Sequence, residues 1–367
     1  MITRRALAGA AGALAAGCAS GPGANETREK PMTARPIVIA HRGASGERPE
    51  HTMAAYRLAI AQGADYIEPD LVPTKDGVLV ARHENEIGLT TDVADRPEFA
   101  ARRRSAMIDG KPAEGWFTED FTLEELKTLR CRERLPALRP QNLEYNDQEA
   151  IPTLSEVIDL VLAESVRSGR SIGLYPELKH PAYFAARGID VTVPLLAELN
   201  RNGFDRRDSP VFIQCFELGA LQKLRSQTSV RLVMLIDAQG QPADFAATGD
   251  SRTYADFLTM PGLRALRRVV DGIGPHKGLL IPRDATNASR TPTDLVGRAH
   301  AAGLLVHPWT FRAENAFLPT ELRLGDPTAA DYERRHGLLQ VELKTFLALG
   351  IDGVFCDFTA AAVAART

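Results

Sequence analysis

The residues most suited to chemistry lie in two short segments near the start of the chain. His41 and Arg42 open the segment HRGASGERPEHT at 41–52, and Glu68 and Asp70 follow soon after it. Each segment comes at the end of a predicted strand, so an imidazole, a guanidinium and two carboxylates should meet at one rim. Carboxylates can hold a divalent cation, and a guanidinium binds phosphate through paired hydrogen bonds. The two segments therefore predict a site for a metal and a phosphate together.

A third carboxylate is predicted at the same rim. Glu68 and Asp70 are two residues apart on a strand and point to one face, and Glu177 and Lys179 repeat that spacing on a later strand. Neighbouring carboxylates repel each other unless a cation or a shared proton intervenes. A lone Glu-x-Asp pair is more often an exposed edge or a salt bridge, but here successive strand ends each carry such a group. Three carboxylates without cysteine suit Mg²⁺ or Ca²⁺ better than zinc or copper.

Two histidines are placed to move protons beside this metal. His41 ends the first predicted strand and His83 follows the third, so both should lie over the same opening. Two imidazoles beside a phosphate supply a general acid and a general base near neutral pH. Arg42 offers bidentate phosphate binding and Lys179 adds a point charge.

Other polar and aromatic residues are weaker candidates. Gln214 and Phe216 share a face at the end of a predicted strand and belong either to the pocket or to the core. Trp309 either stacks on a substrate or covers the opening of the barrel. We expect His51 to brace the loop before the first helix, and Asp357 to cap a helix at its amino-terminal end.

The elements that must position these residues alternate between short apolar runs and longer helical patterns. The runs are at 37–40, 66–71, 78–81, 172–175, 211–214, 232–236, 304–306 and 353–355. Helical patterns such as 52–62, 153–164 and 191–202 lie between them, and Thr153 with Glu156 predicts a capping box. This alternation predicts an α/β fold, a closed (β/α)8 TIM barrel. A ninth candidate, 271–274 with 279–281, is interpreted as an extra short strand.

Two stretches do not fit the repeat. The polar segment at about 86–150 separates the third run from its helix, and a second irregular stretch covers about 312–338. Connections this long in a compact domain are typically lids or small inserted subdomains. Both follow strand ends, so we expect both on the catalytic face.

Bulk composition is consistent with one large domain, predicted at 36–362. The chain has 367 residues, of which 44% are hydrophobic and 25% charged, and a net charge of -3. That balance argues against a nucleic-acid partner, because no basic excess exists to neutralise a phosphate backbone. We predict no protein partner. Cys131, Cys215 and Cys356 show no C-x-x-C spacing, so we expect buried free thiols.

The amino-terminal end has the layout of an export signal at 1–17. A basic Arg4-Arg5 pair, similar to a twin-arginine signal, precedes a run of Ala, Gly and Leu that ends at Cys18. Residues 14–18 are similar to a lipobox, in which Cys18 would be lipidated. Residues 18–35 would then form a flexible tether. These features predict an exported protein, either periplasmic or a membrane-anchored lipoprotein tethered through Cys18.

These motifs together resemble the glycerophosphodiester phosphodiesterase family, in particular its longer bacterial periplasmic members. The supporting segments lie at 41–52, 62–72, 91–96, 175–179, 214–216, 306–312 and 352–358. They cover the chain after the tether in family order. Pro69 departs from the pattern, because longer members often have a polar residue there. The resemblance implies a (β/α)8 barrel with a family-type insertion after the third strand.

The resemblance also implies roles for the candidate residues. Glu68, Asp70 and Glu177 would bind a divalent metal, with Ca²⁺ expected before Mg²⁺. His41 and His83 would act as general acid and base, while the remaining candidates would bind substrate: Arg42, Lys179, Gln214, Phe216 and Trp309.

The implied reaction is hydrolysis of a glycerophosphodiester to sn-glycerol 3-phosphate and an alcohol. One alternative keeps the fold and the metal but acts on lysophospholipid or sphingolipid headgroups, like the related phospholipase D toxins. Those toxins generally lack a large polar insertion after the third strand, which favours the small soluble diester. Another alternative is a surface lipoprotein that binds glycerophosphodiesters without turnover. Such a protein should have lost a histidine or a carboxylate, and here every one is present.

Overall fold

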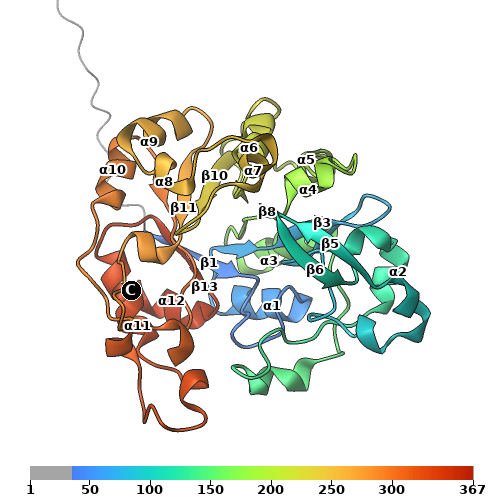
Figure 1. Ribbon diagram of the computed structural model, residues 1–367, viewed down its shortest axis with the longest axis horizontal. Helices are drawn as coiled ribbons and strands as arrows, with labels where there is room; N and C mark the ends of the chain where they lie inside the picture. Colours follow the sequence, from blue (N-terminus) through green and yellow to red (C-terminus); the bar gives the residue numbers. More distant parts are fainter. Residues whose placement is uncertain (1–34, 367) are drawn as a thin grey trace, which may run out of the picture. The chain divides into compact units, whose positions relative to one another are not determined.

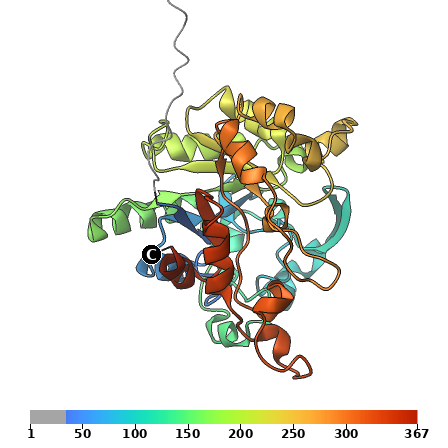
Figure 2. The same ribbon diagram turned by 90° about the vertical axis from the view of Figure 1, so that its left-hand side faces the viewer.

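The computed structural model describes residues 35–366, and the strands of this part form a closed ring surrounded by helices (Figures 1 and 2). The predicted export signal at 1–17, the predicted lipidation site Cys18 and the tether up to residue 34 lie outside the described residues. None of the helices in the described part has both the length and the apolar composition that crossing a bilayer requires.

The ring is the predicted (β/α)8 barrel. In order around it lie β1 (Ile37–His41), β2 with β3 (Tyr66–Glu68, Asp70–Pro73), β7 with β8 (Gly173–Leu174, Glu177–Leu178), β9 (Phe212–Cys215), β10 (Arg231–Ile236), β11 (Gly272–Pro275), β12 (Leu305–Val306) and β13 (Gly353–Cys356). β13 pairs in parallel with β1. The Phe311 N–H donates to the Phe355 carbonyl over 2.9 Å, which joins the segment after β12 to β13. The barrel is thereby closed.

Two of the predicted strands have different roles from those expected. The third run forms β4 (Leu79–Ala81), which pairs antiparallel with β3 and is not one of the parallel barrel strands. The connection between β3 and β4 is a tight turn in which Thr74 N–H donates to Val78 O over 2.9 Å. A parallel neighbour needs a much longer crossover.

The ninth candidate is a full barrel strand rather than an extra one. β11 pairs in parallel with both β10 and β12, so it is the sixth of the eight strand positions of the ring. Only the first half of that candidate is a strand. The second half, 279–281, includes the end of the short helix η5 (Lys277–Leu279) and has no strand.

Two of the helices begin at the capping residues that the sequence predicts. Thr153 and Glu156 form the predicted capping box at the start of α3, and Thr52 accepts a hydrogen bond from Ala55 N–H at the start of α1. The α-helices are α1 (Met53–Ala61), α2 (Leu123–Thr128), α3 (Leu154–Ser168), α4 (Pro181–Ala185), α5 (Thr192–Arg201), α6 (Leu218–Arg225), α7 (Ala243–Thr248), α8 (Tyr254–Phe257), α9 (Met260–Leu266), α10 (Leu295–Ala301), α11 (Leu339–Leu347) and α12 (Thr359–Ala365).

The segment between β4 and α3 contains a hairpin and several short helices. β5 (Arg104–Ile108) and β6 (Lys111–Gly115) form the antiparallel hairpin, drawn in teal beside β8 in Figure 1. The short helices of this segment are η1 (Val93–Asp95), η2 (Pro97–Arg102), η3 (Thr118–Asp120) and η4 (Pro140–Tyr145). Buried side chains of the segment, such as Phe99 and Phe121, belong to the same hydrophobic core as the barrel. The segment is therefore packed onto the barrel.

A second irregular segment follows β12. It contains η6 (Asn315–Phe317), η7 (Thr320–Leu322) and η8 (Tyr332–Arg334). Arg139 of the first segment is buried and pairs with Glu314 of this one over 2.6 Å. The two segments therefore meet directly.

Aromatic side chains fill the interior of the barrel. Tyr175 stacks on Phe212 with ring centres 5.0 Å apart, and it meets Phe355 edge-on at the same distance. Its hydroxyl lies 2.8 Å from Nδ1 of His307. Because the interior is packed, a substrate can reach the strand ends only from the opening.

Candidate active site

β1 ends in a tight turn that requires glycine. Arg42 and Gly43 both have left-handed backbone, with φ of 60° and 85°. A Cβ at Gly43 would lie 2.7 Å from the backbone carbon of Ala55 in α1, too close for any side chain. The turn directs Arg42 N–H at Oε2 of Glu68, 2.8 Å away. The ends of β1 and β2 are thus joined at the rim.

The three predicted metal ligands form one buried cluster. Glu68, Asp70 and Glu177 each offer an oxygen atom, and these atoms lie within 4.8 Å of one another. Asp70 is opposite Glu177 in the register of β3 with β8. Pro69 has no N–H, but its carbonyl accepts from Glu177 N–H over 2.9 Å, so the strands stay paired.

The electrostatics of this cluster favour a bound cation. Burial and the neighbouring carboxylates Asp70 and Glu177 raise the pKa of Glu68 well above its usual value. Burial likewise raises the pKa of Glu177 to about 8, although Lys179 opposes the shift. Burial would also raise the pKa of Asp70, but Lys179 and Arg42 hold it well below its usual value. The three buried carboxylates repel one another when ionised, and a bound cation would remove that repulsion. Their oxygen atoms are ligands that suit a hard divalent cation.

His41 is held by a carboxylate on one ring nitrogen. Its Nδ1 lies 2.7 Å from Oδ1 of Asp357, and Nε2 has no hydrogen-bond partner among the described residues. Burial and the positive charge of Arg42 lower the pKa of His41 to about 4, against the opposing effect of Asp357. Proton donation from Nδ1 to Asp357 would leave Nε2 free to accept a proton.

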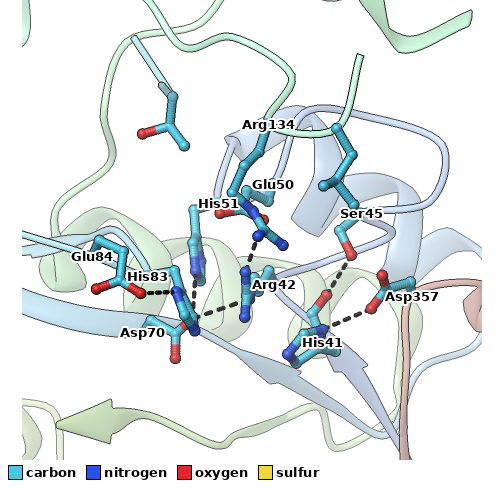
Figure 3. Close-up of polar contacts among 12 residues, drawn as sticks. His41, Arg42, Ser45, Glu50, His51, Asp70, His83, Glu84, Arg134 and Asp357 are labelled. Atoms are coloured by element: carbon cyan, nitrogen blue, oxygen red, sulfur yellow. Dashed lines mark hydrogen bonds and ion pairs between the residues drawn. The ribbon is translucent and has the colours of Figure 1, made fainter. Parts of the chain in front are cut away.

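His83 has a similar arrangement. Its Nδ1 lies 2.8 Å from Oε1 of Glu84. Burial, Arg42 and Lys179 lower the pKa of His83 to about 3. In the view of Figure 3, His83 and His41 lie on opposite sides of Arg42.

The two predicted phosphate-binding cations are buried and paired with carboxylates. Arg42 lies 2.9 Å from Glu50 and 3.2 Å from Asp70 (Figure 3). Lys179 lies 2.8 Å from Glu177. Both side chains are held in place by these ion pairs, so they are preorganised to meet an anion at the strand ends.

A cavity of about 90 Å³, which we call the catalytic cavity, gathers most of these residues. Its walls include His41, Arg42, Glu68, His83, Glu177, Lys179, Gln214, Phe216 and Trp309. Asp70 does not line it but belongs to the same carboxylate cluster as Glu68 and Glu177. Gln214 donates to Glu68 over 3.1 Å, and Trp309 donates to the Gly274 carbonyl over 2.7 Å. The structure therefore brings together all the residues predicted for the site.

The expectation for Asp357 was wrong. α12 begins at Thr359, and neither Asp357 nor Phe358 makes a side-chain cap bond. Asp357 instead holds His41 and accepts from Arg139 over 2.6 Å and from Arg312 over 2.9 Å. Its position directly after the buried strand β13 was the signal that could have placed it at the rim.

Three other residues of the site were given no role from the sequence, although Glu50 and Arg312 lie in segments that carry the family resemblance. Arg312 also lines the catalytic cavity, and Glu50 and Glu84 are the carboxylate partners of Arg42 and His83. His51 braces its loop as expected, with Nδ1 2.8 Å from the Tyr56 hydroxyl, but its Nε2 also reaches Asp70 over 2.9 Å. These contacts support the groups that face the cavity.

Comparison with known proteins agrees with this geometry. Residues 41–361 match the model of the glycerophosphoryl diester phosphodiesterase family. The chain is 37% identical to glycerophosphodiester phosphodiesterase GDPD6 of Arabidopsis thaliana, over 94% of this chain and 92% of that protein. It is 30% identical to a glycerophosphodiester phosphodiesterase of Haemophilus influenzae, over 83% of this chain and 86% of that protein.

Solved structures show the same fold. A glycerophosphodiester phosphodiesterase from Agrobacterium tumefaciens superposes with a TM-score of 0.53 at 19% identity, covering 90% of this chain and 99% of that one. A phosphodiesterase from Oleispira antarctica, solved with the product sn-glycerol-3-phosphate, gives a TM-score of 0.58 at 21% identity, over 90% and 96%. The family model matches most of the chain, and the Arabidopsis thaliana relative is similar over nearly the whole length of both proteins. The chain therefore belongs to the glycerophosphoryl diester phosphodiesterase family.

Proposed function

We propose that this enzyme hydrolyses glycerophosphodiesters to sn-glycerol 3-phosphate and an alcohol, using a divalent metal and two histidines. The observation that carries the proposal is the buried cluster of Glu68, Asp70 and Glu177 beside His41 and His83. The Oleispira antarctica relative was solved with sn-glycerol-3-phosphate, which supports the product.

Each group has a defined task in this proposal. A divalent cation held by the three carboxylates would withdraw charge from the phosphoryl oxygens and lower the pKa of the attacking hydroxyl. Arg42 and Lys179 hold the phosphate at the strand ends. The attacking hydroxyl belongs either to a water or to carbon 2 of the substrate glycerol. One of His41 and His83 accepts its proton, and the other donates a proton to the departing alcohol oxygen. Where the 2-hydroxyl attacks, a water then opens the cyclic phosphate and gives sn-glycerol 3-phosphate.

The alternatives from the sequence have less support. A binding protein without turnover should have lost part of the site, but both histidines and all three carboxylates are present and gathered. Phospholipase D toxins, which act on lysophospholipid or sphingolipid headgroups, generally lack the insertion after the third strand. Here the segment between β4 and α3 is present and packed onto the barrel.

The test measures glycerol 3-phosphate released from glycerophosphocholine. We expect His41→Ala and His83→Ala each to lower kcat by at least about 100-fold, because each removes an acid–base group. His336→Ala serves as the matched control, since His336 is exposed and does not line the catalytic cavity. Chelator treatment should abolish turnover and added Ca²⁺ should restore it, with Mg²⁺ as the second ion tried. Near-normal turnover by the His41 variant, or failure of both ions, would refute the proposal.

A further inference from the structure

A second cavity opens beside the catalytic cavity and is much larger. It has a volume of about 390 Å³, and we call it the side cavity. The two cavities share Glu177, Lys179 and Phe216 in their walls. The catalytic cavity alone is smaller than the roughly 300 Å³ at which small-molecule sites begin, so a whole diester needs more room. A substrate with its phosphate at Lys179 can extend into the side cavity.

The side cavity carries an unpaired buried carboxylate. Glu217 lines it and is only 3% exposed. Its Oε2 accepts from the Ala182 N–H over 2.8 Å, while Oε1 has no partner among the described residues. Burial, together with Asp109 and Asp244, raises the pKa of Glu217 to about 8. A buried carboxylate without a counter-ion is costly, and a cation bound beside it would remove that cost.

The remaining charges of the side cavity leave a negative excess. Asp109 is paired with His180 over 2.6 Å, and Glu177 is paired with Lys179. Asp237 and Lys111 line the cavity with opposite charges and have no ion-pair partner among the described residues. Glu217 is then the buried acidic group of this cavity that a cationic ligand could pair with, because it lines the cavity and has no ion-pair partner in the described part of the chain.

Aromatic rings line the route from the phosphate to this carboxylate. The Phe216 ring lies 5.6 Å from Trp309 in the catalytic cavity and 6.2 Å from Tyr254 in the side cavity, measured between ring centres. Both contacts are nearly perpendicular. Aromatic faces next to a carboxylate are the surroundings that bind alkylammonium groups.

We propose that the side cavity binds the alcohol half of the substrate, and that Glu217 selects alcohols that carry an ammonium group, such as choline or ethanolamine. This inference rests on the proposed function, because the phosphate must lie in the catalytic cavity for the alcohol to reach Glu217.

A cavity on the other side of Trp309 is the competing place for the alcohol. It has a volume of about 430 Å³ and includes Lys277, Arg283 and Arg312, which would suit an anionic alcohol. However, Lys277 and Arg283 both pair with Glu342, and Arg312 pairs with Asp357. Each of these cations therefore has a carboxylate partner, although Lys277 and Arg283 share one, whereas Glu217 has no ion-pair partner among the described residues.

The test compares two substrates that differ in the charge of the alcohol. We would measure kcat/KM for glycerophosphocholine and for glycerophosphoglycerol with metal-loaded wild type, Glu217→Gln and Asp190→Asn. Asp190 is the matched control, because it is a carboxylate of the same region that pairs with Lys223 and does not line the side cavity. Loss of one ion pair should lower the choline-to-glycerol ratio of kcat/KM about tenfold in Glu217→Gln. The ratio should stay within about twofold in Asp190→Asn.

A second measurement needs no turnover of the choline substrate. Free choline should inhibit hydrolysis of glycerophosphoglycerol several-fold more strongly than its uncharged isostere 3,3-dimethylbutan-1-ol, and Glu217→Gln should remove that difference. Asp237→Asn, at the exposed edge of the same cavity, provides a second variant if Glu217→Gln fails to fold. It should lower the ratio by less.

The outcomes separate this inference from the proposed function. If wild type hydrolyses neither diester, the proposed function fails. If wild type hydrolyses both but neither variant changes the ratio, and choline inhibits no better than its isostere, the assignment of the side cavity is wrong. A preference for glycerophosphoserine or another anionic alcohol would place the alcohol in the competing cavity instead.

Discussion

At the residue scale, both proposed acid–base histidines have a carboxylate on Nδ1. His41 is held by Asp357 and His83 by Glu84. The carboxylate orients the ring and favours proton transfer through the other nitrogen. Asp357 is also the more constrained of the two carboxylates, because Arg139 and Arg312 both bind it. It is a positioning residue that acts through His41.

We expect Asp357→Asn to lower kcat on the order of 100-fold, within the range for acid–base groups, while KM changes by less than about threefold. The amide keeps the shape of the carboxylate but removes the charge that stabilises protonated His41. Steady-state kinetics on glycerophosphocholine checks this. Asp352→Asn is the control. Asp352 also holds a histidine, since its carboxylate lies 2.8 Å from Nε2 of His300, but neither residue lines the catalytic cavity. Equal losses in both variants would indicate a general effect on folding rather than on His41.

At the element scale, the β5–β6 hairpin is tied to the barrel rim by His180. The ring lies 2.6 Å from Asp109 at the hairpin tip and 3.2 Å from Glu84 after β4. His180 has left-handed backbone, with φ of 50°. One imidazole therefore joins the hairpin, β4 and the loop after β8 at the edge of the side cavity.

This contact should depend on pH. Burial lowers the pKa of His180, but hydrogen bonds to Asp109 and Glu84 outweigh it and raise the pKa to about 9. A raised folded-state pKa gives stability that is fully present below about pH 6.5 and is lost as the pH rises through about 9. We expect wild type to exceed His180→Asn by about 2 kcal/mol in free energy of unfolding at pH 6.5. The difference should largely vanish by pH 10.

Urea unfolding at several pH values measures that difference. Asparagine is the suitable replacement because it tolerates left-handed backbone, so the variant loses the charge without added strain. A difference that stays constant from pH 6.5 to pH 10 would show that the ion pairs of His180 contribute nothing to stability.

At the scale of the whole molecule, the carboxylate cluster couples metal binding to stability. Glu68, Asp70 and Glu177 come from separate strands, so folding forces them together. A cation that binds only the folded state stabilises it by mass action. Without the cation, Glu177 keeps its proton in the folded state up to its raised pKa of about 8, because its anion would lie buried beside Asp70.

We therefore expect chelator-treated protein to melt below metal-loaded protein, with a gap that widens from pH 6 to pH 8. The sign follows from the raised pKa of Glu177, because an acid that holds its proton longer in the folded state makes stability fall as the pH rises. Glu68→Gln should raise the melting temperature of the chelated protein by about 2 °C and narrow the gap, since it removes one repelling charge. A gap independent of pH would contradict this account.

The sequence alone determined the chemistry of the rim. Side chains two residues apart on a strand share a face, so Glu68 with Asp70 and Glu177 with Lys179 were predictable from spacing. Gln214, Phe216 and Trp309 were candidates for the rim because each lies at or after the end of a short apolar run, but the sequence left pocket and core open for the first two. The barrel was also predictable, since alternating apolar and helical runs have few other solutions.

Only the tertiary structure decided which strands form the ring and what lies against the site residues. Whether 78–81 or 271–274 joins the barrel depends on pairing between distant segments, and both read alike as short apolar runs. Asp357 meets His41 across the closure of the ring, and Glu217 faces a cavity built from four separate loops. Local spacing cannot encode such contacts, because they arise when the chain closes on itself.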